Sequence, residues 1–329
     1  MRNPGPLPES LGLRFAVADA LNAGATPGRL RRSDLDAPFH AVRVRPIASD
    51  LSDFDPFTRQ VTERRIQAYH YAPRLRADQV LSHESAVAVL GGPLPLVFTP
   101  RSDTDGAPPD PMDGQHLDVH VSTIGDGPLV RAKGVRGHRA APDATTVSRV
   151  RDFMIVSPAT SWAQLAHLRL PDLVALGDYY CRQWRPGPGR PDVGRAPLTT
   201  IDQLRSTIAS FRWSGIRRLR EAVELVREDS WSPRESQLRC HLVLAGLPEP
   251  LLNHDVYEDG RFLGCVDLAY PDRKIAIEYH GVLHSGQYAA DVERIAGLRA
   301  AGWIVIEVTS ALFAHPEQII ARVRAALRA

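Results

Sequence analysis

The sequence is poor in cysteine and in long hydrophobic runs. Its three cysteines, Cys181, Cys240 and Cys265, form neither a C-x-x-C pair nor a disulfide framework, which is typical of a reducing compartment. No apolar run approaches the roughly 20 residues that a membrane-spanning helix needs. The N-terminal segment MRNPGPLPES also lacks the basic and then apolar pattern of a signal peptide. These absences predict a cytoplasmic protein with no membrane partner.

Lysine and net charge are scarce as well. Only Lys133 and Lys274 are lysines among 40 basic residues, and the formal net charge is +2. A net charge this small does not by itself attract nucleic acid. Residues 232–329 hold 10 basic and 12 acidic residues. Any affinity for DNA is therefore expected from arginines elsewhere, including those of an N-terminal module.

Residues 10–45 predict that module as two helices and a strand. LGLRFAVADALNAG is expected to be a helix that ends at a glycine. Thr26 and Pro27 suit the N-cap and first position of a second short helix, and FHAVRVRP alternates like a strand. This order suits a winged helix-turn-helix that reads DNA. A purely structural helix pair is the alternative.

The middle of the chain has an α+β pattern. LSHESAVAVLGGP predicts a short helix, LDVHVS and VRAKGVRGHR predict strands, and a strand and two helices are expected over residues 152–181. His116, Asp118 and His120 alternate along one strand and could bind a metal, although a solvent-exposed strand face is the preferred interpretation. WRPGPGRPDVGRAP, residues 184–197, predicts an exposed loop, and two further helices follow it.

The last hundred or so residues predict a compact α/β unit. A helix begins at Ser232, with Pro233 at its first position and Glu235 at its third, and ends at Gly246. A β-hairpin, a helix closed by Gly302, the strand WIVIEVT and a terminal helix follow. This order predicts a mixed sheet flanked by helices.

The hairpin GCVDLAYPDRKIAIEYHG places two carboxylates among residues of a sheet core. With the Pro-Asp-Arg turn at its centre, Tyr270 faces Ile275 and Asp267 faces Glu278. Like charges directly opposite each other destabilise a sheet, unless a cation lies between them. Hard cations such as Mg²⁺ are bound by carboxylate oxygens. Solvated acids on the wet face of an antiparallel sheet are the alternative.

These residues resemble a known nuclease family. ESQLR, GCVDLAYPDRKIAIEYHG, LH and GWIVIEVT, in that order, are similar to the domain related to very-short-patch-repair endonucleases, in the PD-(D/E)XK nuclease group. This resemblance implies a restriction-endonuclease-like mixed sheet. The first two-thirds more loosely resemble AbiEi-type antitoxin proteins, through SHESAVAVLGGPLP, VRGHR and SPATSWAQLAHLRLPDLVALGD. That second resemblance implies a cognate toxin partner.

The nuclease resemblance implies that Asp267 and Glu278 bind Mg²⁺ or Mn²⁺, with Glu235 as an outer acidic residue of the site. Glu235 is also the third helical residue after Ser232, as in a capping box, so both roles stay open. The family pattern has lysine, or aspartate in an EYDG-type motif, where this chain has His280. A histidine there could accept a proton from water near neutral pH, or mark a site that has lost activity.

His284, in LHSG, matches a recurrent histidine of the family and could act as a base or donate a hydrogen bond to a phosphate oxygen. Together these residues predict a metal-dependent endonuclease that hydrolyses DNA phosphodiester bonds, linked to phage defence or DNA repair. One alternative is a non-catalytic, antitoxin-like transcriptional regulator with a degenerate nuclease domain. Another is a pure interaction protein. The predicted parts are a winged-helix module (1–75), an α+β domain (76–198), a helical connector (199–231) and the nuclease-like domain (232–329).

Overall fold

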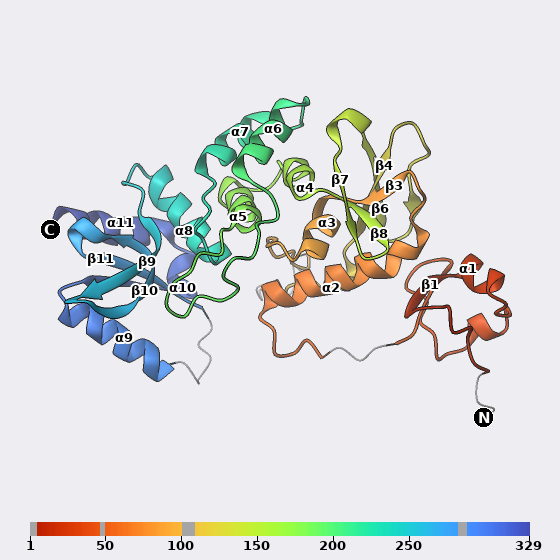
Figure 1. Cartoon of the computed structure of the whole chain (residues 1–329), viewed down its shortest axis with the longest axis horizontal. Coiled ribbons are helices and arrows are strands. Elements are labelled where there is room, and N and C mark those ends of the chain that lie inside the picture. The colour runs from red at the N-terminus through yellow and green to blue at the C-terminus, as the bar shows by residue number, and fades with distance from the viewer. Residues whose placement is uncertain (1–4, 47–49, 101–108, 282–287) are drawn as a thin grey trace. The chain divides into compact units, whose positions relative to one another are not determined.

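The computed structural model describes residues 5–46, 50–100, 109–281 and 288–329 (Figure 1). The chain divides into two compact units, and the predicted mixed α/β class is confirmed. The first unit comprises Met1–Ala166 and Ser206–Ile216, and the second comprises His167–Arg205 and Arg217–Ala329. The finer division at residues 75, 198 and 231 stays a prediction.

The N-terminal segment differs from its predicted pattern. It contains β1 (Arg14–Ala16), α1 (Val17–Asn22), a 3-10 turn (Arg29–Arg31) and β2 (Val42–Val44). The helix expected over residues 11–24 is wrong at its start, because Arg14–Ala16 pairs antiparallel with Val42–Val44. The second expected helix is only the three-residue turn. The winged helix-turn-helix therefore stays a prediction.

The rest of the first unit is a mixed six-stranded sheet covered by helices. Its strands run in the order β5-β6-β4-β3-β8-β7, with β3/β8 and β4/β6 parallel and the other pairs antiparallel. The elements are α2 (Pro56–Tyr71), β3 (Gln79–Leu81), α3 (His83–Leu90), β4 (Val119–Ile124), β5 (Arg131–Ala132), β6 (Val135–Ala140), β7 (Val147–Val150), β8 (Phe153–Val156) and α4 (Pro158–Gln164), with 3-10 turns at Ala72–Arg74, Gly114–His116 and Pro142–Ala144.

The second unit contains the carboxylates predicted from the hairpin. Its elements are α5 (Leu170–Cys181), α8 (Pro233–Leu244), β9 (Leu251–Glu258), β10 (Arg261–Tyr270), a 3-10 turn (Pro271–Arg273), β11 (Ile275–His280), α9 (Tyr288–Ala300), β12 (Ile304–Thr309), α10 (Ser310–Phe313) and α11 (Pro316–Arg328). Helices α6 (Ile201–Ala209) and α7 (Ile216–Leu225) lie at the division between the units.

The second unit has three layers, helix on sheet on helix. Its sheet runs β12-β11-β10-β9, with β11 and β12 parallel and the other pairs antiparallel. Apolar residues of α8 and α11 pack on one face with Ile275 and Ile277, and residues of α9 pack on the other face with Ala269 and Ala276 (Figure 1). Alternation along β11 therefore assigns Glu278 to the α9 face.

Helix α5 belongs to this unit because it packs on α8 through a buried ion pair. Arg239 donates to the Asp178 carboxylate at 3.1 Å, and both side chains are at most 1% exposed. Arg239 also donates to Glu249 at 2.7 Å. A buried pair of this kind is costly to break, because one charge is then left uncompensated. It fixes the position of α8, which carries Glu235.

The hairpin register is the one predicted. Tyr270 pairs with Ile275 and Leu268 pairs with Ile277 across the turn. The prediction missed β9, which forms a second hairpin with β10. Asp259 and Gly260 both have positive φ (48° and 79°) at that turn, as a tight type I′ connection requires.

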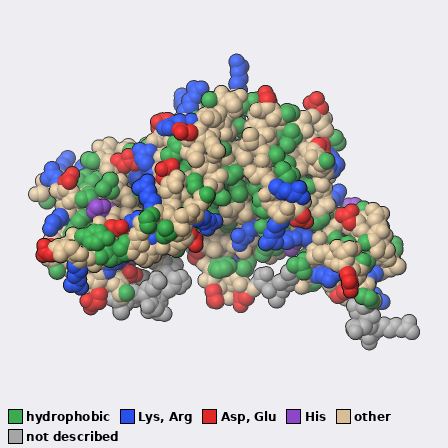
Figure 2. Space-filling model, viewed as in Figure 1, with side chains coloured by type: hydrophobic (Ala, Val, Ile, Leu, Met, Phe, Trp, Pro, Cys, Tyr) green, Lys and Arg blue, Asp and Glu red, His purple; other side chains and the backbone are tan. Residues whose placement is uncertain are grey.

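On the face seen in Figure 2, basic and acidic side chains are interspersed over the surface. This distribution agrees with the small net charge of the whole chain. Among the described residues, no helix combines the length and the apolar character that crossing a membrane requires.

Candidate functional site

Asp267 and Glu278 lie on neighbouring strands, where the β10–β11 hairpin register places them opposite each other. The regular strand pairing ends at Leu268 and Ile277, one step before them. Beyond that point the Asp267 carboxylate accepts a hydrogen bond from the Tyr279 backbone amide at 2.7 Å. Glu278 is only 4% exposed. The two acids are therefore held across one hairpin, mostly out of water.

Glu235 joins them from the first turn of α8. Its Oε2 accepts hydrogen bonds from the Trp231 amide (2.9 Å) and from the Asn253 side-chain amide (2.8 Å). Its own backbone amide donates to the Ser232 hydroxyl, as expected for a capped helix. The Ser232 cap is thus present, but the Glu235 carboxylate accepts from the Trp231 amide, one residue before the N-cap, rather than from the Ser232 amide as in a full capping box. Asp267, Glu278 and Glu235 form what we call the carboxylate cluster.

Burial raises the pKa of every member of the carboxylate cluster. The pKa of Glu278 rises to about 8, first because of burial and then because of the Asp267 charge. The pKa of Glu235 rises to about 7 for the same two reasons. Burial also raises the pKa of Asp267, although its bond from the Tyr279 amide acts in the other direction. Three such neighbours cannot all ionise near pH 7 unless a cation compensates them.

A cation of the chain itself already reaches this cluster. Arg294, on α9, donates to both carboxylate oxygens of Glu278, at 2.6 and 3.3 Å, and it also donates to Asp291 at 3.4 Å. This fork-shaped contact is the strong bidentate form of an arginine–carboxylate pair. A metal ion bound by Glu278 would have to share or displace this guanidinium.

Gly264 makes room for Arg294. A Cβ at this position would lie 2.8 Å from Cδ and 2.9 Å from Cγ of Arg294. The glycine also has φ of +152°, and the β9–β10 register shifts between Phe262 and Gly264. Both features need glycine, which lacks a side chain and tolerates this backbone conformation. The route of Arg294 to Glu278 therefore depends on Gly264.

His280 lies at the end of β11, with Nε2 3.4 Å from Oε2 of Glu307 on β12. Glu307 pairs with Glu278 in the parallel ladder, and Arg299 donates to it at 2.5 Å. A carboxylate beside an imidazole orients the ring. His284, the other predicted histidine, lies outside the described residues.

The predicted alternation of His116, Asp118 and His120 along one strand is wrong. β4 begins at Val119, His116 lies in a 3-10 turn, and Asp118 precedes the strand. His116 and Asp118 are exposed, whereas His120 is buried. A 3-10 turn does not alternate as a strand does, so the three side chains do not share a face.

A pocket of about 340 Å³ adjoins the carboxylate cluster. Trp231 and Asn253, the two hydrogen-bond donors to Glu235, both line it. Arg185 and Arg190 line it too, and Arg190 pairs with Asp255 at 2.8 Å. Arginines at the edge of such a pocket are suited to contact phosphate oxygens.

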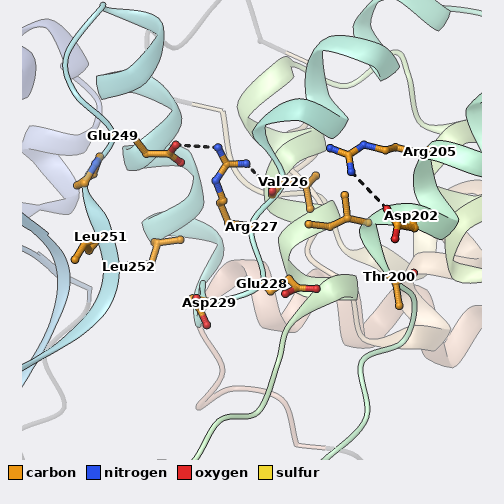
Figure 3. Close-up of a pocket in the computed structure, with 12 residues that line it drawn as sticks. Thr200, Asp202, Arg205, Val226, Arg227, Glu228, Asp229, Glu249, Leu251 and Leu252 are labelled. Atoms are coloured by element: carbon orange, nitrogen blue, oxygen red, sulfur yellow. Dashed lines mark hydrogen bonds and ion pairs between the residues drawn. The ribbon is translucent and has the colours of Figure 1, made fainter.

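A larger pocket of about 610 Å³ borders this one and shares Asp229, Leu251 and Leu252 with it (Figure 3). Charged side chains line it, and they pair with one another: Arg227 contacts Glu249 at 2.8 Å, and Arg205 contacts Asp202 at 3.5 Å. No member of the carboxylate cluster lines either pocket, and only the smaller one is lined by Trp231 and Asn253, the donors to Glu235. The size of the larger pocket therefore does not make it the candidate active site.

Sequence reasoning missed Asn253, Arg294 and Glu307. Asn253 is a strained position, because it has φ of +46° inside β9 while its side chain bonds Glu235 and the Asp229 carbonyl. Strained backbone of this kind clusters at functional sites. The only sequence signal for Asn253 is that a polar residue stands within the weakly apolar run LLNHDVYE. Arg294 and Glu307 become neighbours of Glu278 only through tertiary packing.

No protein-family model matches the chain, and no solved structure matches it. Over 167 residues, 49% of its length, the chain is 26% identical to the uncharacterized protein Rv2248 of Mycobacterium tuberculosis strain ATCC 25618 / H37Rv. The uncharacterized protein MT2308 of M. tuberculosis strain CDC 1551 / Oshkosh matches equally well. The chain spans 57% of the length of these curated relatives. Their names carry no activity, so a functional argument depends on the chemistry of the site.

Proposed function

We propose that the second unit is a metal-dependent nuclease that hydrolyses phosphodiester bonds in DNA. The observation that supports this most is the convergence of Asp267, Glu278 and Glu235, from three elements, in one poorly solvated site. Carboxylate oxygens are the ligands that Mg²⁺ and Mn²⁺ prefer, and raised pKa values beside a pocket are typical of functional sites.

In this proposal Asp267 and Glu278 hold the metal, which when bound polarises the phosphate and activates a water. His280 accepts a proton from the attacking water at Nδ1, and Glu307, 3.4 Å from Nε2, orients the ring. The Glu235 carboxylate accepts two hydrogen bonds, and one of them holds the Asn253 side chain at the wall of the adjoining pocket. Arg185 and Arg190 contact the DNA backbone there.

The alternative is a non-catalytic DNA-binding regulator, and one observation favours it. Arg294 already supplies a positive charge to Glu278, as expected where an arginine has replaced a metal in a site that no longer cleaves. This alternative predicts binding of DNA that needs no divalent metal. A cognate toxin partner belongs to this same alternative.

Cleavage of supercoiled plasmid and of single-stranded DNA, with Mg²⁺, Mn²⁺ or EDTA, tests the proposal. Glu278→Gln keeps the size of the side chain and removes its charge. Glu258→Gln, an exposed glutamate of β9, makes the same change outside the site. We expect metal-dependent nicking by the wild type and E258Q, and cleavage slowed by about a hundred-fold or more in E278Q.

If the wild-type chain cleaves neither substrate with either metal, and DNA binding survives EDTA, the nuclease proposal is contradicted and the regulator is supported. Cleavage by E278Q at the wild-type rate would remove Glu278 from the mechanism.

We further propose that the protein works in a reducing cytoplasm. Its three cysteines are free thiols in the structure. Burial raises the pKa of both Cys181 and Cys240 to about 12, so these thiols stay protonated and unreactive at neutral pH. Identical electrophoretic mobility with and without reductant, after exposure to air, would agree with this setting.

A further inference from the structure

Three histidines of the first unit converge from segments far apart in the sequence. They come from the start of α3 (His83), from β4 (His120) and from β6 (His138), and one nitrogen of each lies within 4.8 Å of the others. Strands β4 and β6 are parallel, with His120 opposite Arg136. His138, two residues further along β6, therefore lies on the same face as His120. We call these residues the histidine cluster.

The spacing of the ligand atoms suits a small cation. His120 Nδ1 lies 3.1 Å from His138 Nε2 and 3.1 Å from Oε2 of Glu84. Metal–ligand bonds of about 2.0–2.1 Å place neighbouring ligands of a tetrahedral zinc site about 3.3 Å apart. The two observed distances are close to this edge, and the ligand nitrogen of His83 lies within 4.8 Å of those of the other two histidines.

The backbone directs His83 toward the cluster. His83 has φ of +49°, a left-handed conformation that is uncommon for any residue but glycine. Its amide donates to the Gln164 side chain at 3.0 Å, and its Nδ1 lies 3.0 Å from the Ser82 hydroxyl. The ring then stacks on His138 with centroids 3.8 Å apart. Strain of this kind persists where surrounding contacts hold a residue in a required position.

The protonation states also suit a metal. Burial lowers the pKa of His120, and burial together with the His120 charge lowers the pKa of His138 to about 4. Both rings are therefore neutral at pH 7 and offer lone pairs. Arg64 and Arg136 oppose a cation, because their charges act on His120 in the same direction as burial. Glu84 offsets part of that positive charge.

We propose that His83, His120, His138 and Glu84 bind a Zn²⁺ ion that ties α3 to β4 and β6. Three imidazoles and one carboxylate form a closed tetrahedral set, as in a structural zinc site. Glu84 is essential in this arrangement, because without it two arginines would face a divalent cation. The site lies in the first unit and does not depend on the nuclease proposal.

Zinc titration of the metal-stripped full-length chain, in competition with a chromophoric chelator, tests this site. We expect one tight Zn²⁺ equivalent, a higher melting temperature with zinc, and the visible bands of tetrahedral cobalt when Co²⁺ replaces it. His138→Gln and Glu84→Gln should each weaken Zn²⁺ binding by about a hundred-fold. His116→Gln, an exposed histidine of the same unit, is the matched control and should bind as the wild type does.

Zinc could also occupy the carboxylate cluster, so the titration is repeated in Asp267→Asn/Glu278→Gln, which should retain the tight equivalent. If a histidine variant fails to fold, X-ray absorption at the zinc edge of the wild type decides. Nitrogen-dominated coordination with imidazole scattering supports the proposal. Oxygen-only coordination, or binding that H138Q and E84Q leave unchanged, overturns it.

Discussion

The carboxylate cluster and the histidine cluster show what burial does to acids and to bases. Both groups of side chains are largely removed from water, and burial favours the neutral form of each. For Glu278 the neutral form carries a proton, because its pKa rises to about 8. For His138 the neutral form has lost its proton, because its pKa falls to about 4. The same physical cause thus makes one cluster hold protons more tightly and leaves the other ready to donate lone pairs.

This difference has a consequence for metal binding. A cation must displace protons, and also Arg294, from the carboxylate cluster before it binds there. His120 and His138 have no protons to release at neutral pH, so at these two ligands zinc competes only with the neighbouring arginine charges. The first cluster is therefore expected to be regulated by pH, and the second to bind its ion over a wide range of pH.

The largest expected effect of a substitution on stability concerns Arg294, the cation of the carboxylate cluster. In EDTA, Arg294→Gln should lower the free energy of unfolding by about 3 kcal/mol, because Glu278 loses its partner. Saturating Mn²⁺ should recover much of this loss, because the metal replaces the missing charge. Chemical denaturation measures both, with exposed Arg322→Gln as the control. A deficit that Mn²⁺ leaves unchanged would identify Arg294 as the permanent cation and favour the regulator.

The stability of the metal-free chain should depend on pH through Glu278. Because its pKa rises from 4.5 to about 8 on folding, the folded chain holds a proton that the unfolded chain has lost. The free energy of unfolding therefore falls as pH rises through this window, by roughly 3–4 kcal/mol between pH 5 and pH 8. Denaturation curves at several pH values measure the slope. Glu278→Gln should flatten it, and an unchanged slope in that variant would assign the effect to other groups.

Metal affinity should distinguish the two clusters. From pH 6.5 to 7.5, Mn²⁺ affinity at the carboxylate cluster should rise about tenfold, because a proton leaves as the metal binds. Zn²⁺ affinity at the histidine cluster should change about twofold or less over that range. Free Mn²⁺ measured by electron paramagnetic resonance, and chelator competition for Zn²⁺, give the two slopes. Equal pH slopes for Mn²⁺ and Zn²⁺ would contradict the expected difference in proton release between the two clusters.

The smallest effect separates the two roles of Glu235. Ser232→Ala removes the hydroxyl that accepts from the Glu235 amide, and should cost about 1 kcal/mol of stability. Cleavage should stay within about twofold of the wild type, because the carboxylate keeps its bonds to Trp231 and Asn253. Glu235→Gln should instead slow cleavage. Equal loss of cleavage in S232A and E235Q would mean that Glu235 affects cleavage only through the helix cap.

Local rules of sequence were sufficient for much of the second unit. The N-cap and proline at the start of α8, the glycines after α8 and α9, and the alternation through the hairpin each depend on neighbouring residues. The N-terminal segment shows where these rules fail. Its helical pattern begins at residue 11, but pairing of Arg14–Ala16 with a strand almost 30 residues later prevails. β9 was missed because Asn253 interrupts its apolar pattern.

The sequence by itself determined the α/β class, the hairpin register and the three acids, because each depends on periodicity, turn chemistry or an ordered motif. Only the tertiary structure decided that Arg294 reaches Glu278 over Gly264, and that Glu307 lies beside His280. It also brought together His83, His120 and His138, which the sequence places in separate segments. Contacts between elements distant along the chain depend on how sheets and helices pack, and no local pattern specifies that packing.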